Sequence, residues 1–255
     1  MAIRDLLPLS RWSRRRHAVP SGQRWYAIGD IHGCYDLLDR LIREIDRDDE
    51  QRGTADTRLI FLGDYIDRGP DSRAVIELMM KLDLGDERVV FLMGNHEEVL
   101  RATADGNRRA AALFHKMGGR ETLLSYGVSA QDYDYADASG IIDLVRSHVP
   151  QAHLDWLGKL RDLYSTGDYV FVHAGLRPGV SLDEQDPADL RWIRREFLDH
   201  PASHGAMVVH GHSVNRSIDE RTNRIGIDTG AYATGCLTAV GLEGQQRWYL
   251  QTDGR

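Results

Sequence analysis

Short apolar runs, each broken by glycine and a polar side chain, recur along the chain. Five of them are three to five residues long and rich in Val, Ile and aromatic side chains, at residues 25–28, 59–62, 89–93, 169–172 and 207–209. Runs of this length and composition, bounded by turn residues, are typical of buried β-strands.

Helical periodicity separates the first three of these runs. Apolar residues within 37–45 and within 75–80 recur at the i, i+3, i+4 spacing of one helical face. Strand and helix therefore alternate in the first half, which predicts a mostly parallel sheet. The later runs at 225–228, 237–242 and 247–250 lie closer together, which indicates antiparallel hairpins or a meander.

Residues 100–165 interrupt this alternation. Residues 108–119 have the composition of a helix that ends at Gly118-Gly119, and a polar aromatic stretch follows at 131–138. We expect a helical insertion that lies beside the sheet and forms one wall of the functional site.

Composition and charge narrow the class of protein. The chain has 255 residues, 42% hydrophobic and 28% charged, which fits one large globular domain over residues 21–255. A net charge of −7 disfavours a nucleic-acid partner. No apolar run is long enough to span a bilayer, and the two distant cysteines, Cys34 and Cys236, do not suggest a disulfide framework. These features favour a cytoplasmic protein.

Residues 1–20 differ from the rest. They contain five arginines and one aspartate, a local charge of +4. We interpret them as a basic, partly disordered N-terminal arm, and as a candidate for contact with an acidic partner.

Each of the five apolar runs is followed by side chains that can bind a metal ion. The carboxyl ends of strands meet at one edge of an open α/β sheet, so residues distant in sequence converge there. Oxygen and imidazole donors without a thiolate suit Mn²⁺, Fe or Zn²⁺. We expect two divalent ions, most simply Mn²⁺, held by Asp30, His32, Asp64, Asn95, His173 and His212.

The local spacing of these residues has physical reasons. Asp30 and His32 are two apart, so both can point to one ion from an extended backbone. Asp64 is the best candidate for a ligand shared by two ions. His96, next to Asn95, is left for proton transfer.

Three sequence blocks resemble the signature motifs of PPP-type serine/threonine protein phosphatases, within the calcineurin-like metallophosphoesterases of bacteria and phages. They are Gly29-Asp30-Ile31-His32-Gly33, the block from Gly63-Asp64 to Asp67-Arg68-Gly69, and Gly94-Asn95-His96-Glu97. His173-Ala174-Gly175 and Gly211-His212-Ser213 resemble the two later histidine motifs. The resemblance implies an α/β fold with a central β-sandwich of mixed sheets flanked by helices, in an α/β/β/α arrangement.

The same resemblance implies roles for single residues. Asp30, His32 and Asp64 would hold one ion, and Asp64, Asn95, His173 and His212 the other. His96 would be the general acid, oriented by Asp67. Arg68 would bind the phosphate together with Arg194, for which Arg191 and Arg195 are rivals. His210 is a rival of His212.

The implied reaction is hydrolysis of a phosphomonoester, with a phosphorylated protein (on serine or threonine, or with dual specificity) or a small phosphoester as substrate. Met93 departs from the pattern, because many relatives have Arg there, and this weakens the assignment to protein phosphatases. The alternatives are a diadenosine-tetraphosphate hydrolase, a small-metabolite phosphatase or phosphodiesterase, and a non-catalytic module that binds phosphorylated ligands.

Overall fold

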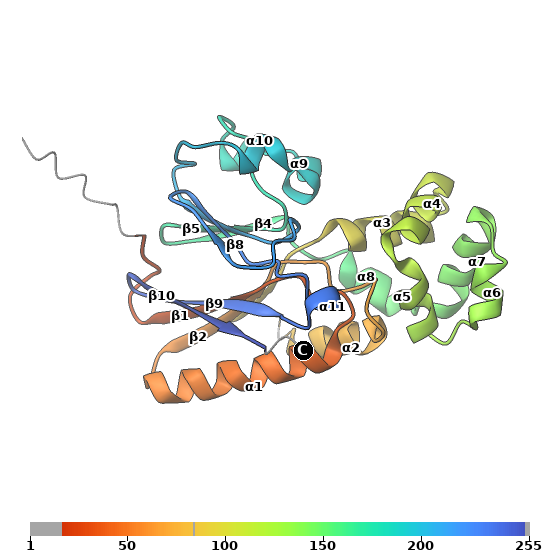
Figure 1. The fold of residues 1–255 in the computed structure, drawn as a ribbon, viewed down its shortest axis with the longest axis horizontal. Helices are drawn as coiled ribbons and strands as arrows, with labels where there is room; N and C mark the ends of the chain where they lie inside the picture. Colours follow the sequence, from red (N-terminus) through yellow and green to blue (C-terminus); the bar gives the residue numbers. More distant parts are fainter. Residues whose placement is uncertain (1–16, 84, 253–255) are drawn as a thin grey trace, which may run out of the picture.

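Two five-stranded sheets face each other in the computed structural model, which describes residues 17–83 and 85–252 (Figure 1). The first sheet has the strand order β10-β9-β1-β2-β3. Its strands are β1 (Gln23–Ile28), β2 (Asp56–Phe61), β3 (Val89–Phe91), β9 (Thr238–Glu243) and β10 (Gln246–Gln251). β1, β2 and β3 are parallel, whereas β9 runs antiparallel to both β1 and β10.

The second sheet has the order β4-β5-β6-β8-β7. Its strands are β4 (Leu163–Thr166), β5 (Tyr169–Val172), β6 (Met207–His210), β7 (Asp219–Glu220) and β8 (Arg224–Gly226). β5, β6 and β8 are parallel, and β4 and β7 are antiparallel edge strands. Each sheet therefore contains three adjacent parallel strands, and the loops that follow parallel strands lie at the same end of the sheet.

Apolar side chains fill the space between the sheets and cover both outer faces. In β1, Trp25 and Ala27 point to the second sheet, whereas Tyr26 and Ile28 point to the helices outside the first. This alternation follows from the two-residue period of a strand. It shows why the run is apolar throughout, because a strand covered on both faces has no solvent side.

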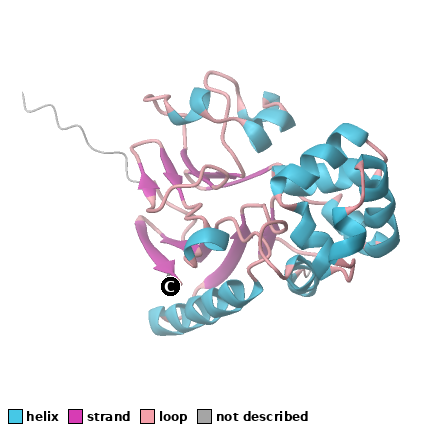
Figure 2. Ribbon diagram, turned by 45° about the vertical axis from the view of Figure 1, so that its right-hand side comes forward, coloured by secondary structure: helices cyan, strands magenta, loops and turns pink. Residues whose placement is uncertain are grey.

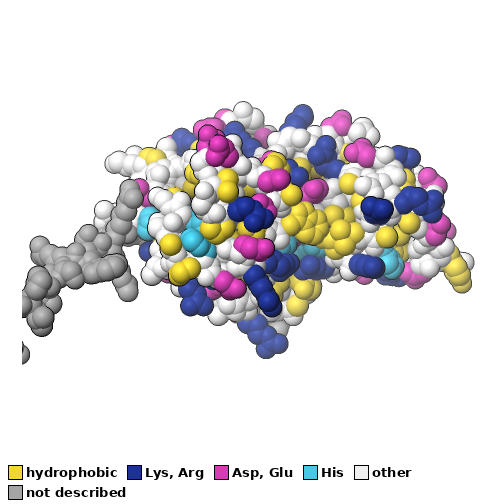
Figure 3. Space-filling model, turned by 90° about the horizontal axis from the view of Figure 1, so that it is seen from above, with side chains coloured by type: hydrophobic (Ala, Val, Ile, Leu, Met, Phe, Trp, Pro, Cys, Tyr) yellow, Lys and Arg dark blue, Asp and Glu magenta, His cyan; other side chains and the backbone are white. Residues whose placement is uncertain are grey.

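Helices cover the outer faces of the sandwich (Figure 2). α1 (Tyr35–Arg52) and α2 (Ser72–Leu82) pack on the first sheet. α9 (Pro187–Trp192) and α10 (Arg195–Leu198) pack on the second through Leu190 and Phe197. The predicted α/β sandwich of mixed sheets flanked by helices is therefore confirmed. On the face that carries α9 and α10, basic and acidic side chains are interspersed (Figure 3).

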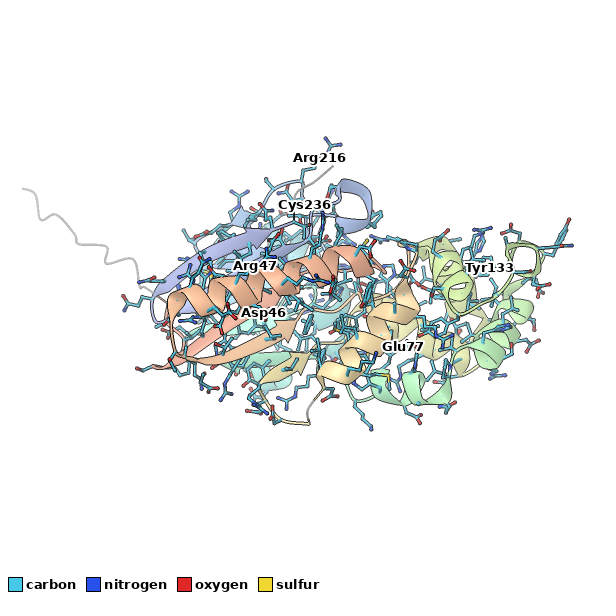
Figure 4. The ribbon with its side chains drawn as sticks, turned by 90° about the horizontal axis from the view of Figure 1, so that it is seen from below. Asp46, Arg47, Glu77, Tyr133, Arg216 and Cys236 are labelled. Carbon is cyan, nitrogen blue, oxygen red and sulfur yellow. The ribbon has the colours of Figure 1, made fainter. Side chains whose placement is uncertain are left out.

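The predicted helical insertion extends from one end of the sandwich. It contains α4 (Arg108–Met117), α5 (Gly119–Ser125), α6 (Ala130–Asp134), α7 (Ala138–His148) and α8 (Gln151–Leu157). α3 (Asn95–Ala104) begins at the end of β3 and leads into the insertion. Figure 4 shows Tyr133 among these helices, Glu77 on the adjoining α2, and Asp46 and Arg47 farther away on α1. The helix expected at 108–119 is α4, which ends at Gly118 with a φ of 99°.

The structure adds detail to two expectations from the sequence, one about the C-terminal strands and one about the N-terminal arm. The antiparallel hairpins expected near the C-terminus are β7–β8 and β9–β10. β8 contains Ile225 and Gly226 of the expected run and also pairs in parallel with β6, which the sequence did not indicate. Its Ile225 packs between the sheets. Residues 17–20, assigned to the basic arm, lie against the domain: Val19 is buried and donates a backbone hydrogen bond to Gly244. The rest of that arm, residues 1–16, lies outside the described residues.

No helix in the described part of the chain has the length and apolar character needed to cross a bilayer. The short α11 (Ala231–Thr234) follows β8, and its Tyr232 ring lies 5.4 Å from the ring of His32.

Candidate active site

The loops after five parallel strands bring together the residues that the sequence selected. Asp30 and His32 follow β1, and Asp64 follows β2. Asn95 is the first residue of α3, directly after β3. His173 and His212 follow β5 and β6, so the site takes residues from both sheets. All six side chains are buried.

Asp64 lies at the centre of the site. Its Oδ2 is 3.6 Å from His32 Nε2 and 3.8 Å from His96 Nε2, while its Oδ1 is 3.4 Å from His173 Nε2. Two groups of side chains have their donor atoms within 4.8 Å of one another: His32, Asp64 and His96, and Asp64, His173 and His212. Asp64 is thus common to two groups that could each hold a metal ion.

Asn95 joins the second group through its amide oxygen. Asn95 Oδ1 is 3.0 Å from both His173 Nε2 and His212 Nδ1. Asp30 is a member of neither group, and its carboxylate accepts the backbone N–H of His212 at 3.0 and 3.2 Å. His96 has joined the first group by distance, although the sequence assigned it to proton transfer.

Backbone carbonyls orient two of the histidine rings. His32 Nδ1 donates to Ile66 O at 2.8 Å, and His173 Nδ1 donates to Leu62 O at 2.9 Å. Each ring therefore directs the lone pair of Nε2 toward Asp64. Burial lowers the pKa of His32 to about 3 and also lowers the pKa of His173. Both rings are neutral near pH 7, which is the state that binds metals.

Burial and mutual repulsion disfavour the charged forms of two carboxyl groups at the site, Asp30 and Asp228. Burial raises the pKa of Asp30, and the charges of Asp228 and Asp64 raise it further. Burial likewise raises the pKa of Asp228 to about 6. Asp228 Oδ1 accepts the N–H of Gly230, but Asp228 Oδ2 is buried without a hydrogen-bond partner in residues 17–83 and 85–252. Cations at this place would compensate these charges, so the site fits divalent metal ions.

Asp228 is one of two acidic residues whose importance the sequence did not reveal. The other is Glu97, which is fully buried and accepts backbone N–H groups from Asp64 at 2.9 Å, Tyr65 at 2.8 Å and Gly94 at 3.0 Å. Glu97 therefore fixes the loop that presents Asp64. A glutamate directly after Asn-His at a helix start was the available signal, since its carboxylate can reach back to nearby backbone donors.

Backbone strain concentrates in the site. Among the described residues, all five non-glycine residues with positive φ lie in its loops: His32 (47°), Asp64 (51°), Asp67 (71°), Arg68 (68°) and His212 (60°). Such conformations cost energy and persist where the surrounding structure enforces them. Their clustering indicates that the loops are shaped for function.

His96 and Asp67 form a buried pair suited to proton transfer. His96 Nδ1 donates to Asp67 Oδ2 at 2.6 Å, and His96 Nε2 faces Arg68 Nη2 at 3.2 Å. Burial alone would lower the pKa of His96, but the charge of Asp64 and the hydrogen bond to Asp67 outweigh it and raise that pKa. An imidazole held this way can carry a proton near neutral pH.

The predicted phosphate-binding arginines differ in their surroundings. The guanidinium of Arg68 lies 4.7 Å above the ring of Tyr232, beside His96. Arg194 is exposed and forms no ion pair with any described residue. Burial lowers the pKa of His212 to about 2, and Arg194 is close enough to add to this shift.

The rival residues lie elsewhere or are already paired. Arg191 is bound to Asp162 and lies 3.5 Å from Glu98. The ring of His210 packs on Phe197 at 5.0 Å, outside both groups that could hold a metal. Arg195 is exposed on α10. The geometry therefore favours Arg194 and His212 over their rivals.

Comparison with known proteins identifies the class. The chain belongs to the calcineurin-like phosphoesterase family, whose profile matches residues 24–232. The resemblance that we described from the sequence is thus confirmed for the superfamily, but not for its protein-phosphatase branch.

Named relatives fall into two groups. The symmetrical bis(5'-nucleosyl)-tetraphosphatase of Dechloromonas aromatica is 33% identical over 153 residues, which cover 60% of this chain and 44% of that enzyme. The asymmetrical bis(5'-nucleosyl)-tetraphosphatase PrpE of Anoxybacillus flavithermus is 26% identical, covering 84% of this chain and 88% of that enzyme. Serine/threonine-protein phosphatase 1 of Salmonella typhimurium is 27% identical, covering 86% and 91%.

The chain spans less than half the length of the symmetrical enzymes it matches, such as 44% of the Dechloromonas protein. Among solved structures, a chain proposed to be a diadenosine tetraphosphatase has a TM-score of 0.62 at 20% identity, covering 93% of this chain and 99% of that one. A serine/threonine phosphatase from Saccharomyces cerevisiae has a TM-score of 0.54 at 14% identity, covering 95% and 85%. These two likenesses concern the fold alone.

Proposed function

We propose that this phosphoesterase hydrolyses dinucleoside tetraphosphates. Two exposed aromatic rings lie beside the site, and they support this proposal independently of sequence similarity. The ring of Tyr232 lies 5.4 Å from that of His32, and the ring of Trp192 lies 6.5 Å from that of His212. Aromatic faces stack on nucleobases, and the neighbouring Arg68 and Arg194 suit a chain of phosphates between two bases. The named tetraphosphatases support the same substrate class.

The metal ligands in this proposal are Asp30, His32, Asp64, Asn95, His173 and His212, with two divalent ions, of which Mn²⁺ is the first choice and Fe or Zn²⁺ the others. When bound, such ions supply Lewis acidity and lower the pKa of water at the site. Arg68 and Arg194 bind the phosphoryl oxygens and neutralise charge that grows in the transition state. His96 transfers a proton to the departing oxygen, while Asp67 fixes its tautomer. This complete set argues against a non-catalytic binding module.

Hydrolysis of phosphomonoesters, including phosphorylated serine or threonine, is the second candidate. The hydrogen bond of 2.6 Å between His96 and Asp67 favours it. A nucleotide is a good leaving group, because its terminal phosphate has a pKa of only about 6. A serine alkoxide is far more basic and must be protonated as it leaves, so a complete general acid matters more for a monoester. Small-metabolite phosphomonoesters would use the same chemistry.

A substrate panel separates these candidates. The protein, purified with Mn²⁺, is given diadenosine tetraphosphate, p-nitrophenyl phosphate and a phosphoserine peptide at matched concentrations. We expect the largest kcat/KM for the dinucleotide, and chromatography identifies cleavage as symmetrical (two ADP) or asymmetrical (AMP and ATP). A larger kcat/KM for the peptide would replace the first candidate by the second. No turnover of any substrate would contradict both.

A further inference from the structure

The helical insertion reaches into the site at one point, through residues 118–122. Thr122 lies on α5, which is part of the insertion, and is fully buried. Its hydroxyl donates to Asp67 Oδ1 at 2.6 Å and accepts the backbone N–H of Asp67 at 2.9 Å. Two residues that are 55 positions apart in the chain are therefore joined by two hydrogen bonds.

Proton counting fixes the direction of these bonds. A threonine hydroxyl has one proton, and Thr122 gives it to Asp67, whose carboxylate has none to offer. Ser72 Oγ lies 3.0 Å from Thr122 Oγ1, so Ser72 must be the donor in that contact. Ser72 Oγ also accepts the N–H of Asp67 at 3.1 Å. A closed ring of hydrogen bonds thus surrounds Asp67.

Few other contacts hold the carboxylate of Asp67 in its position. Its side chain is fully buried, and within the described residues its carboxylate has two hydrogen-bond partners, His96 on Oδ2 and Thr122 on Oδ1. Its backbone is held at a φ of 71°, where a non-glycine residue is strained. Loss of the Thr122 hydroxyl would leave Oδ1 without a donor in a dry environment, and the carboxylate would then rotate or shift.

We propose that Thr122 is a positioning residue for proton transfer, holding Asp67 so that Oδ2 meets His96 Nδ1 and His96 Nε2 faces the substrate. The inference rests on the proposed role of His96 as the general acid. The insertion thereby contributes to chemistry as well as forming a wall. The consequence is selective: Thr122 matters when the leaving group needs a proton and is nearly irrelevant when it does not.

Two aryl phosphates of different leaving-group basicity test this selectivity. 2,4-Dinitrophenolate departs without protonation, whereas phenolate requires it. A general acid contributes about 10²–10⁴-fold, and Thr122→Val should lose part of this, so kcat for phenyl phosphate should fall about 10-fold or more. The kcat for 2,4-dinitrophenyl phosphate should stay within about 2-fold, and the metal content should be unchanged. Equal losses on both esters, or no loss on either, would overturn the proposal.

Three further variants keep the test decisive. Thr122→Ser restores the hydroxyl and should recover most of the lost rate, whereas failure to recover it contradicts the proposal. Thr122→Ala removes the hydroxyl without overfilling the site and must reproduce the pattern of Thr122→Val. The control is Thr103→Val: Thr103 is equally buried, but its hydroxyl bonds only within α3, to Val99 O at 2.8 Å. Both esters should be cleaved normally by that variant.

A double variant distinguishes this inference from the proposed function. His96→Asn should show the same selective loss on phenyl phosphate, and adding Thr122→Val should cause no further loss, because both act on one proton transfer. If His96→Asn lowers kcat by the same factor for both esters, the role of His96 as general acid is itself wrong. If His96→Asn is selective and Thr122→Val is not, only the role of Thr122 is wrong.

Discussion

The strand-end loops and the helical insertion contribute to the same site in different ways. The loops supply every candidate metal ligand, and their backbone is strained at five non-glycine positions among the described residues. The insertion supplies no such ligand, and its helices have ordinary caps, such as Asn107 at α4 and Asp137 at α7. It acts through Gly118 and Thr122, which contact Arg68 and Asp67.

The sheets and the insertion therefore have different functions at the site. The sheets fix the positions where cations can bind, because the loops follow five parallel strands and Glu97 holds the loop of Asp64. The insertion fixes the two residues that handle the substrate and its proton. Changes in the loops should therefore remove metal and activity together, whereas changes in the insertion should leave metal in place.

The largest effect is expected for Asp64→Asn. Asp64 is common to both groups of residues that could hold a metal, so the variant should lose at least one of two ions and nearly all turnover. Turnover is measured with p-nitrophenyl phosphate, and bound metal by mass spectrometry. Two ions per chain in the variant would show that the central carboxylate is not shared.

His96→Asn should have the next largest effect. Its kcat should fall about 10²–10⁴-fold for substrates with basic leaving groups, because the variant lacks the imidazole that protonates the departing oxygen. Metal content should stay at the wild-type value. Wild-type turnover of phenyl phosphate in this variant would remove His96 from the acid role.

Gly118→Ala tests whether the insertion positions Arg68. Gly118 has a φ of 99°, and an added Cβ would lie 2.9 Å from Arg68 N, whose N–H donates to Gly118 O. We expect about 10-fold lower kcat/KM, since Arg68 must move, and a stability loss of about 1–3 kcal/mol from the strained backbone.

Gly127→Ala is the matched control for that change. Gly127 has a φ of 92° in the same insertion, but nothing lies within 4 Å of an added Cβ. This variant should lose stability by a similar mechanism and keep full activity. Equal activity in the two variants would mean that the insertion does not position Arg68.

The smallest effect concerns pH and the stability of the insertion. Burial lowers the pKa of His153, whose Nδ1 lies 2.9 Å from the hydroxyl of Tyr126. The unfolded chain therefore binds a proton at this histidine before the folded chain does. The contribution of His153 is complete above its ordinary pKa of about 6.5 and is lost as the pH falls below that value.

Melting temperatures measured between pH 7.5 and 5.5 test this sign. The wild type should lose about 2 °C more than His153→Gln over this range. Identical slopes for the two proteins would exclude His153 as the cause.

The sequence allowed the sandwich and the strand-end residues to be predicted because both follow from local patterns. Asp64 and His173 each come directly after an apolar run, and the ends of parallel strands converge by geometry alone. The parallel pairing of β8 with β6 was not predicted, because the composition of a short run such as 225–228 does not show which other strands lie beside it.

The contributions of Thr122, Glu97 and Asp228 could not be predicted in the same way. Thr122 lies 55 residues from its partner Asp67. It belongs to a helix whose sequence pattern does not show which part of the sheet the helix contacts. Its role depends on how the insertion docks, which is a tertiary contact. Asp228 was visible as part of an Asp-Thr-Gly sequence, but its unpaired oxygen beside Asp30 appears only in three dimensions.

Anomalous diffraction from crystals grown with Mn²⁺ tests the central claim most directly. The account predicts two anomalous peaks on either side of the Asp64 carboxylate, one next to His32 and the other next to His173 and His212. A map without a peak at Asp64, or with its peaks on another part of the surface, would contradict it.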